Sequence, residues 1–223
     1  ENGVTPLFIA CDKGHLEIAR LLEVGAAVDR AMSDGTTPLS AASFNGEIDC
    51  VRLLLEAGAA TDQADAEGFT PLYVACQEGH PEVAQLLLEA SASVGQADKD
   101  GVTPLFIACQ NGHLEIARLL LEAGAAVSQA GNNGATPLYM ACQNGRLECA
   151  QLLLEAGAAM EKADEQGATP LFAACHNGHL EVAKLLSSYG ASRAAMPPFG
   201  TPEEVANRDG HADLAAWLVA SRG

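Results

Sequence analysis

The dipeptide Thr-Pro returns along this chain at an almost constant interval. It begins at Thr5, Thr37, Thr70, Thr103, Thr136, Thr169 and Thr201. The steps between successive pairs are 32 or 33 residues. Repetition at this period indicates a stack of similar units, because one unit of that size cannot bury its apolar surface alone. A length of 223 residues would otherwise suggest one or two globular domains, and the repeat replaces that expectation.

One unit, read from residue 101 to 127 (GVTPLFIACQNGHLEIARLLLEAGAAV), predicts two short helices joined by a turn. Thr103 is placed to cap a helix N-terminus with its hydroxyl, and Pro104 suits the first helical position. Apolar residues recur at helical spacing until Gly112, and a second apolar helix begins near Leu114. Each helix is too short to be stable alone in water. Neighbouring units must therefore cover its apolar face.

The period and the pattern T-P-L-x-x-A-x-x-x-G-H…L-L-L-x-x-G-A resemble the ankyrin repeat family over essentially the whole chain. This resemblance implies an all-α fold, a curved, right-angled solenoid of helix-turn-helix units with short β-hairpin or loop fingers. It implies a single domain, 1–223, with approximate repeats 1–33, 34–66, 67–99, 100–132, 133–165, 166–198 and a C-terminal capping repeat 199–223.

The two ends of the array differ in polarity. Glu203 and Glu204 stand where the inner repeats carry a leucine and an aromatic residue, and the end of a stack needs such a polar face. The first repeat has no comparable polar cap. We therefore expect a native C-terminal end and a truncated N-terminus.

The chain is acidic, with a net charge of −17 at pH 7. This balance argues against binding to nucleic acid or to anionic membranes, and it suits a partner with a basic surface. One repeated acidic position lies near the start of each second helix: Glu17, Asp49, Glu82, Glu115, Glu148, Glu181 and Asp213. Favourable placement at a helix N-terminus explains this ladder, and a basic partner lying along it is the alternative.

Seven cysteines fall on two repeat positions: Cys11, Cys76, Cys109, Cys142 and Cys175 on one, Cys50 and Cys149 on the other. Equivalent residues of neighbouring repeats lie about 8–10 Å apart, too far for a disulfide, and zinc-type spacings are absent. We expect buried, unpaired thiols and an intracellular location, cytoplasmic or nuclear. The sequence has no signal peptide and no apolar run long enough to span a membrane.

No catalytic constellation stands apart from the repeat. Five of the six histidines share the position beside the turn between the two helices, where they are expected to brace that turn. The glycines sit at fixed turn offsets and form no phosphate-binding loop. We therefore predict no enzymatic activity, no catalytic residue, no metal site and no cofactor.

The resemblance implies a protein–protein interaction module that binds through the concave face, with finger tips and first helices. Carried onto this sequence, the candidate partner-binding residues are Phe44, Asn45, Phe69, Gln77, Glu78, Val102, Gln110, Asn111, Gln143, Asn144, His176 and Asn177. Phe44 and Phe69 are the expected aromatic anchors, and the Gln and Asn residues would supply adaptable hydrogen bonds. The expected partner of this monomer is another protein, not nucleic acid or membrane; a merely solvated face is the alternative reading.

The chain departs from the family pattern after T-P-L, where the family's histidine is replaced by Phe8, Ser40, Tyr73, Phe106, Tyr139 and Phe172. We expect these aromatic rings to pack between repeats. Two alternative functions stay open: a structural or targeting spacer within a larger protein, and an engineered ankyrin scaffold. The cysteines weaken the second, since a designer would normally remove them.

Overall fold

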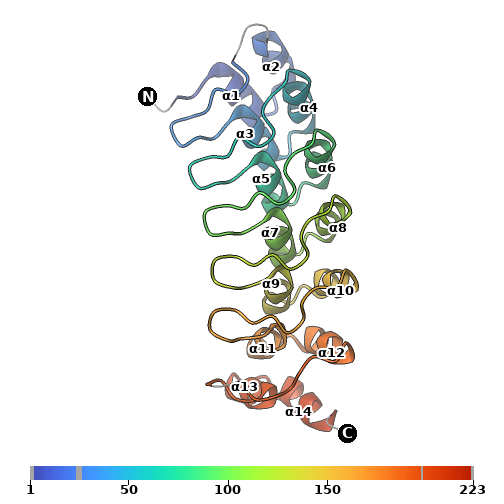
Figure 1. Ribbon diagram of the computed structural model, residues 1–223. Helices are drawn as coiled ribbons and strands as arrows, with labels where there is room; N and C mark the ends of the chain where they lie inside the picture. Colours follow the sequence, from blue (N-terminus) through green and yellow to red (C-terminus); the bar gives the residue numbers. More distant parts are fainter. Residues whose placement is uncertain (1–2, 24–26, 197, 222–223) are drawn as a thin grey trace. The chain divides into compact units, whose positions relative to one another are not determined.

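The computed structural model describes residues 3–23, 27–196 and 198–221. The described chain forms helices in pairs (Figure 1). The first helices of the pairs are α1 (Pro6–Asp12), α3 (Pro38–Asn45), α5 (Pro71–Glu78), α7 (Pro104–Asn111), α9 (Pro137–Gln143), α11 (Pro170–His176) and α13 (Pro202–Arg208). The second helices are α2 (Leu16–Glu23), α4 (Ile48–Glu56), α6 (Pro81–Glu89), α8 (Leu114–Glu122), α10 (Leu147–Glu155), α12 (Leu180–Ser188) and α14 (Ala212–Ala220).

The chain divides into two compact units, which we describe separately. Unit 1 comprises Glu1–Ile107 and Arg118–Ala125, and unit 2 comprises Ala108–Ala117 and Ala126–Gly223. In unit 1, α3 packs between α1 and α5, and α4 packs between α2 and α6. In unit 2, α11 packs between α9 and α13, and α12 packs against α10. Within each unit the helix pairs are thus stacked in chain order, which confirms the predicted all-α class.

Each Thr-Pro pair starts a first helix in the way the sequence predicts. The hydroxyl of Thr103 accepts a hydrogen bond from the Phe106 N–H at 3.2 Å, and Thr37 accepts one from the Ser40 N–H at 3.1 Å. Both threonines are buried, so these bonds satisfy donors that water cannot reach. In the last repeat Glu204 completes a capping box by accepting from the Thr201 N–H at 2.8 Å.

The fingers, the loops that join one helix pair to the next, differ from the expected β-hairpins. Each is a tight turn closed by a backbone bond between its ends, such as Asp65 N–H to Phe69 O at 3.1 Å and Asp98 N–H to Val102 O at 3.0 Å, and by a second bond within the turn, such as Gly68 N–H to Asp65 O at 3.1 Å. The described fingers contain no extended strand; their one bridge joins Met196 to Gly200. These bonds close the turn without pairing extended strands on either side of it, so the fingers take the loop form of the prediction.

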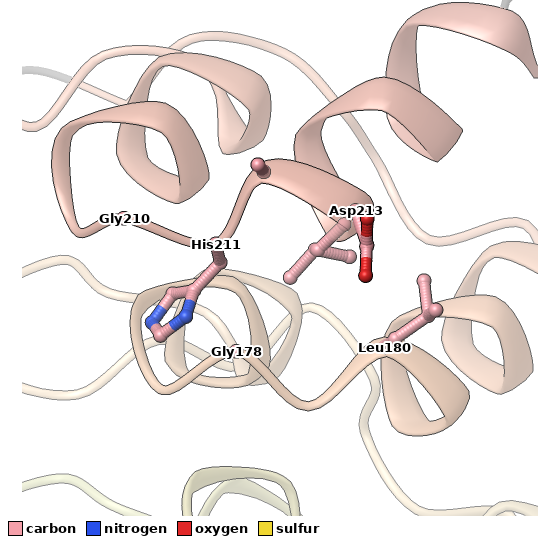
Figure 2. A pocket seen from close by; sticks show the side chains of 7 residues that line it. Gly178, Leu180, Gly210, His211 and Asp213 are labelled. Atoms are coloured by element: carbon pink, nitrogen blue, oxygen red, sulfur yellow. The ribbon is translucent and has the colours of Figure 1, made fainter.

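Several inter-helix turns are braced by a side chain of the following repeat. His80 donates from Nε2 to the Phe44 carbonyl at 3.0 Å, and His179 donates in the same way to the Gln143 carbonyl at 3.0 Å. Figure 2 shows the equivalent His211 ring lying over Gly178 in unit 2. The turn glycine allows this close approach because it has no side chain. The histidines therefore brace the turn of the preceding repeat as well as standing beside their own.

The aromatic series behind the T-P-L position is mostly buried, but its contacts differ along the chain. In unit 2 the centroids of the Phe172 and Phe199 rings lie 4.6 Å apart. Phe172 forms a buried cluster with Ala168 and Val205, and Tyr139 packs against this cluster. In unit 1 the Tyr73 ring stacks instead on Phe69 of its own repeat, with centroids 4.7 Å apart. Packing of these rings between successive repeats is thus seen among repeats five, six and seven of unit 2.

The cysteines are all free and buried. Burial raises the pKa of the Cys175 thiol to about 12, which keeps it protonated and apolar in character. Burial and the neighbouring Cys50 raise the pKa of Cys11, and Cys109 lowers the pKa of Cys149, so the two cysteine positions lie close together across neighbouring repeats. Comparing only equivalent positions missed this pairing, because the two partners occupy different helices of their repeats.

Candidate functional site

A hollow of about 280 Å³ opens in unit 1 beside α3. We call its face, formed by the fingers and the first helices, the finger face (Figure 1). Phe8 and Asp12 of α1 line one side, and Val74 and Gln77 of α5 line the other. The rest of the wall comes from α3 and from two fingers. Three consecutive repeats therefore build the hollow together.

Four of the predicted binding residues line this hollow: Phe44, Asn45, Phe69 and Gln77. Phe44 is 47% exposed, a large fraction for an aromatic side chain. Phe69 is half-buried and held by its stack on Tyr73. The exposed Phe44 ring and the held Phe69 ring together offer an apolar surface to a partner. Because Phe69 is already fixed, binding would cost little of its conformational freedom, which favours contact with a partner.

The polar members of the wall have defined partners. Asn45 donates from Nδ2 to the Asp12 carboxylate and to the Ala41 carbonyl, each at 3.0 Å. The Asp65 Oδ1 atom accepts from the Glu67 and Phe69 N–H groups, each at 2.9 Å. Two carboxylates thus stand in the wall of a mostly apolar hollow.

Glu78 and Val102 do not line this hollow. Glu78 accepts a hydrogen bond from the Gln77 side chain at 2.8 Å, so it lies next to the wall without forming it. Val102 is half-buried in the following finger, where its N–H donates to Asp98 Oδ1 at 2.9 Å. Its backbone is thus held within that turn.

The candidate residues of unit 2 lie at the ends of first helices, and several have structural tasks. Asn144 and Asn177 donate from Nδ2 to the carbonyl one turn back in their own helices, each at 2.9 Å. The Gln110 backbone carbonyl accepts from the Arg146 guanidinium at 3.3 Å, while Gln143 and His176 accept from histidines of the next repeat through their carbonyls. Asn111 ends α7. The Asn144 and Asn177 amides are thus each bonded to their own helix.

Other hollows offer less to a ligand. One of about 350 Å³ in unit 2 lies where α12 and α14 begin (Figure 2), and glycine turns form much of its wall. His211 lines it, but the ring already donates to the His176 carbonyl at 2.9 Å. A third, between α4 and α6, is lined by exposed charged residues with Ile48. Neither is lined by a phenylalanine, tyrosine or tryptophan.

The acidic ladder lies where the sequence places it. Its members occupy the first turns of the second helices and are exposed, as Glu82 in α6 and Glu148 in α10 illustrate. Glu181 also pairs with Lys184 at 2.8 Å. Interaction with the helix N-terminus is enough to account for these residues.

Within the described ranges, no three His, Cys, Asp or Glu residues gather as a metal site would require. The helices of that same part of the chain are too short and too polar to cross a membrane.

Comparison with known proteins agrees with this architecture. The family model described as Ankyrin repeats (3 copies) matches residues 7–98, 59–130, 91–164 and 127–196. A segment of 54 residues is 46% identical to the mouse (Mus musculus) protein named Protein fem-1 homolog A-like, and it covers 24% of this chain and 8% of the mouse protein. The chain thus matches only a small part of that relative. The stacked helix pairs and the overlapping family matches show that the chain belongs to the ankyrin repeat family.

Proposed function

We propose that this ankyrin repeat domain binds a partner protein through the finger face, with the unit 1 hollow as its anchor point. Ankyrin repeat domains are generally protein-binding modules, and they are typically non-catalytic. The observation that carries the proposal is the half-exposed Phe44 ring beside Phe69 at the mouth of an apolar hollow. Aromatic residues next to a pocket are favoured as interface anchors.

The charge of the chain limits the partner further. With a net charge of −17, a partner with a basic surface would be attracted, while nucleic acid and anionic membranes would be repelled. Asp12 and Asp65 at the rim give the same preference locally. We place the encounter in the cytoplasm or nucleus, where seven free thiols stay reduced, and we take the chain to act as a monomer.

The experiment compares two double variants built in the same two repeats. Phe44→Ala with Gln77→Ala changes the hollow, whereas Ile48→Ala with Gln85→Ala changes exposed residues on α4 and α6. Both variants lose one apolar and one amide side chain. Tagged proteins are used to capture partners from a lysate of the expressing cells, and mass spectrometry quantifies what each retains.

We expect one or more proteins to be lost at least fivefold from the hollow variant and retained by the control. Thermal unfolding of both variants verifies that they are folded. Equal capture by the wild type and the hollow variant would show that the finger face of unit 1 is not the binding surface.

A further inference from the structure

The hollow exists because one ring of the aromatic series is missing. The position three residues after each Thr-Pro threonine holds Phe8 in the first repeat and Tyr73 in the third, and both are buried. The second repeat has Ser40 there, 4% exposed and part of the wall. A serine side chain lacks a whole phenyl ring relative to its neighbours. The hollow of about 280 Å³ opens at this vacancy.

A second regularity links this position to the finger of the next repeat. Burial raises the pKa of both Tyr73 and Tyr139, and each hydroxyl lies close enough to a carboxylate, Asp98 and Asp164 respectively, for that carboxylate to raise the pKa further. Where the ring is a phenylalanine, the corresponding finger residue carries no carboxylate: Met32 follows Phe8, Gly131 follows Phe106, and Met196 follows Phe172. An aspartate at this finger position therefore goes together with a hydroxyl-bearing residue in the preceding repeat.

Asp65 is the aspartate of this series that has no tyrosine ring in the preceding repeat, because Ser40 stands there. Its finger holds it as the next finger holds Asp98: in each, Oδ1 accepts two backbone N–H groups at 2.9 Å, from Glu67 and Phe69 in one and from Asp100 and Val102 in the other. The Asp98 carboxylate has the Tyr73 hydroxyl near it, whereas Asp65 lines the hollow together with Ser40. The described contacts of this finger include no hydrogen bond to Asp65 Oδ2.

We infer that the hollow binds a tyrosine side chain from an unphosphorylated, basic segment of the partner protein. The ring takes the place of the missing aromatic residue between Phe44 and Phe69, and its hydroxyl donates to the Asp65 carboxylate. The inference rests on the proposed function and names the chemistry that the same face selects.

Size and charge both fit this occupant. A volume of about 280 Å³ lies just below the range of pockets for drug-sized ligands or cofactors, so one large side chain suits it better. Aromatic neighbours such as Phe44 favour an offset or tilted ring contact. Asp12 in the wall, with exposed Asp34 and Glu67 nearby in the fingers, favours lysine or arginine beside the tyrosine. The same carboxylates repel phosphotyrosine.

Four synthetic peptides test the selectivity directly. Each is a capped pentapeptide Gly-Lys-X-Lys-Gly in which X is tyrosine, phenylalanine, phosphotyrosine or alanine. Binding to the full chain is measured by NMR titration. We expect the tyrosine peptide to bind about tenfold more tightly than the phenylalanine peptide, as one hydrogen bond to a charged group provides. The phosphotyrosine and alanine peptides should cause no saturable shift.

Two variants locate the binding. Ser40→Tyr supplies the missing ring from the chain itself, so the tyrosine peptide should lose at least tenfold in affinity while the melting temperature rises. Asp65→Asn keeps an Oδ1 acceptor for the finger turn but replaces the other carboxylate oxygen by a donor. It should reduce the tyrosine-to-phenylalanine ratio to about one. Asp164→Asn makes the same change in unit 2 and should leave that ratio unchanged.

The outcomes separate this inference from the proposed function. Equal binding of the tyrosine and phenylalanine peptides, or an unaltered ratio in Asp65→Asn, overturns the inference even if Ser40→Tyr fails to fold. If the hollow variant Phe44→Ala with Gln77→Ala still loses its captured protein in that case, the proposed function stands without it. If that variant also retains every captured protein, the proposed function fails as well.

Discussion

Replacing Gly145 by alanine should weaken the fifth repeat in two separable ways. Gly145 has a φ of +67°, a conformation that side-chain-bearing residues rarely adopt. A Cβ atom there would lie 2.6 Å from His179 Nδ1, closer than atoms can pack. The substitution therefore adds backbone strain and also displaces the ring that donates to the Gln143 carbonyl at 3.0 Å.

Gly157 of the same repeat provides a matched reference. Its φ is +83°, and no atom lies within 4 Å of a Cβ built there. Gly157→Ala should therefore cost the backbone strain alone, about 1–2 kcal/mol. Gly145→Ala should cost that strain and the histidine hydrogen bond, worth about 0.5–1.5 kcal/mol. The gain from a stiffer unfolded chain is common to both substitutions, so their difference, about 1 kcal/mol, measures the histidine brace.

A double-mutant cycle with His179→Ala isolates this contribution. The free energy of unfolding is obtained from urea titrations followed by circular dichroism. Gly145→Ala should cost less in the His179→Ala background, because the brace is already absent and the clash is removed. We expect a coupling energy of about 1 kcal/mol between the two sites. Equal destabilisation by Gly145→Ala and Gly157→Ala, with additive effects in the cycle, would refute the brace.

Three further outcomes follow from single contacts. Thr136→Ala should lose about 1 kcal/mol by urea unfolding, since its hydroxyl caps α9, and Thr136→Ser should lose much less. Burial and the Asp164 charge raise the pKa of Tyr139 to about 12. The free energy of unfolding of the wild type, compared with that of Tyr139→Phe, should therefore be constant below pH 10 and should decrease between about pH 10 and 12. The Arg208 guanidinium and, to a smaller extent, His176 lower the pKa of Asp209 to about 2. Stability relative to Asp209→Asn, measured by thermal melts, should therefore be full above about pH 4 and disappear near pH 2.

Most of the fold can be predicted from the sequence because the same helix-starting and helix-ending residues recur in every repeat. A capping threonine hydroxyl with a proline after it starts each first helix, and a glycine stands in the turn that follows the helix. These are short-range signals, so Thr103 capping and the helix at Pro104 could be derived from one unit and confirmed in the structure. The fingers were less certain, since the sequence of a tight turn is compatible with a hairpin and with a loop.

Contacts between different positions of neighbouring repeats were harder to predict. The pairing of Cys11 with Cys50 joins a first helix to the second helix of the next repeat, and spacing between equivalent residues carries no information about it. The same holds for the hollow. Phe44 and Phe69 were predicted as anchors, but Ser40 entered only as an exception to a series, and Asp65 was not predicted at all. Its signal was present in the pairing of tyrosine with a later aspartate.

Departures from a repeat carry information when the repeat already explains the residue that is expected there. In the last repeat, Asn207 replaces the buried cysteine and is exposed, which the end of a stack accounts for. The second repeat is an inner one and has no such reason. There Ser40 removes a buried ring, and Phe44 places an exposed ring on the same helix. The first change alone would cost packing energy, and the second alone would expose apolar surface. Together they make a cavity with an aromatic rim, an arrangement that favours an incoming side chain over an empty groove.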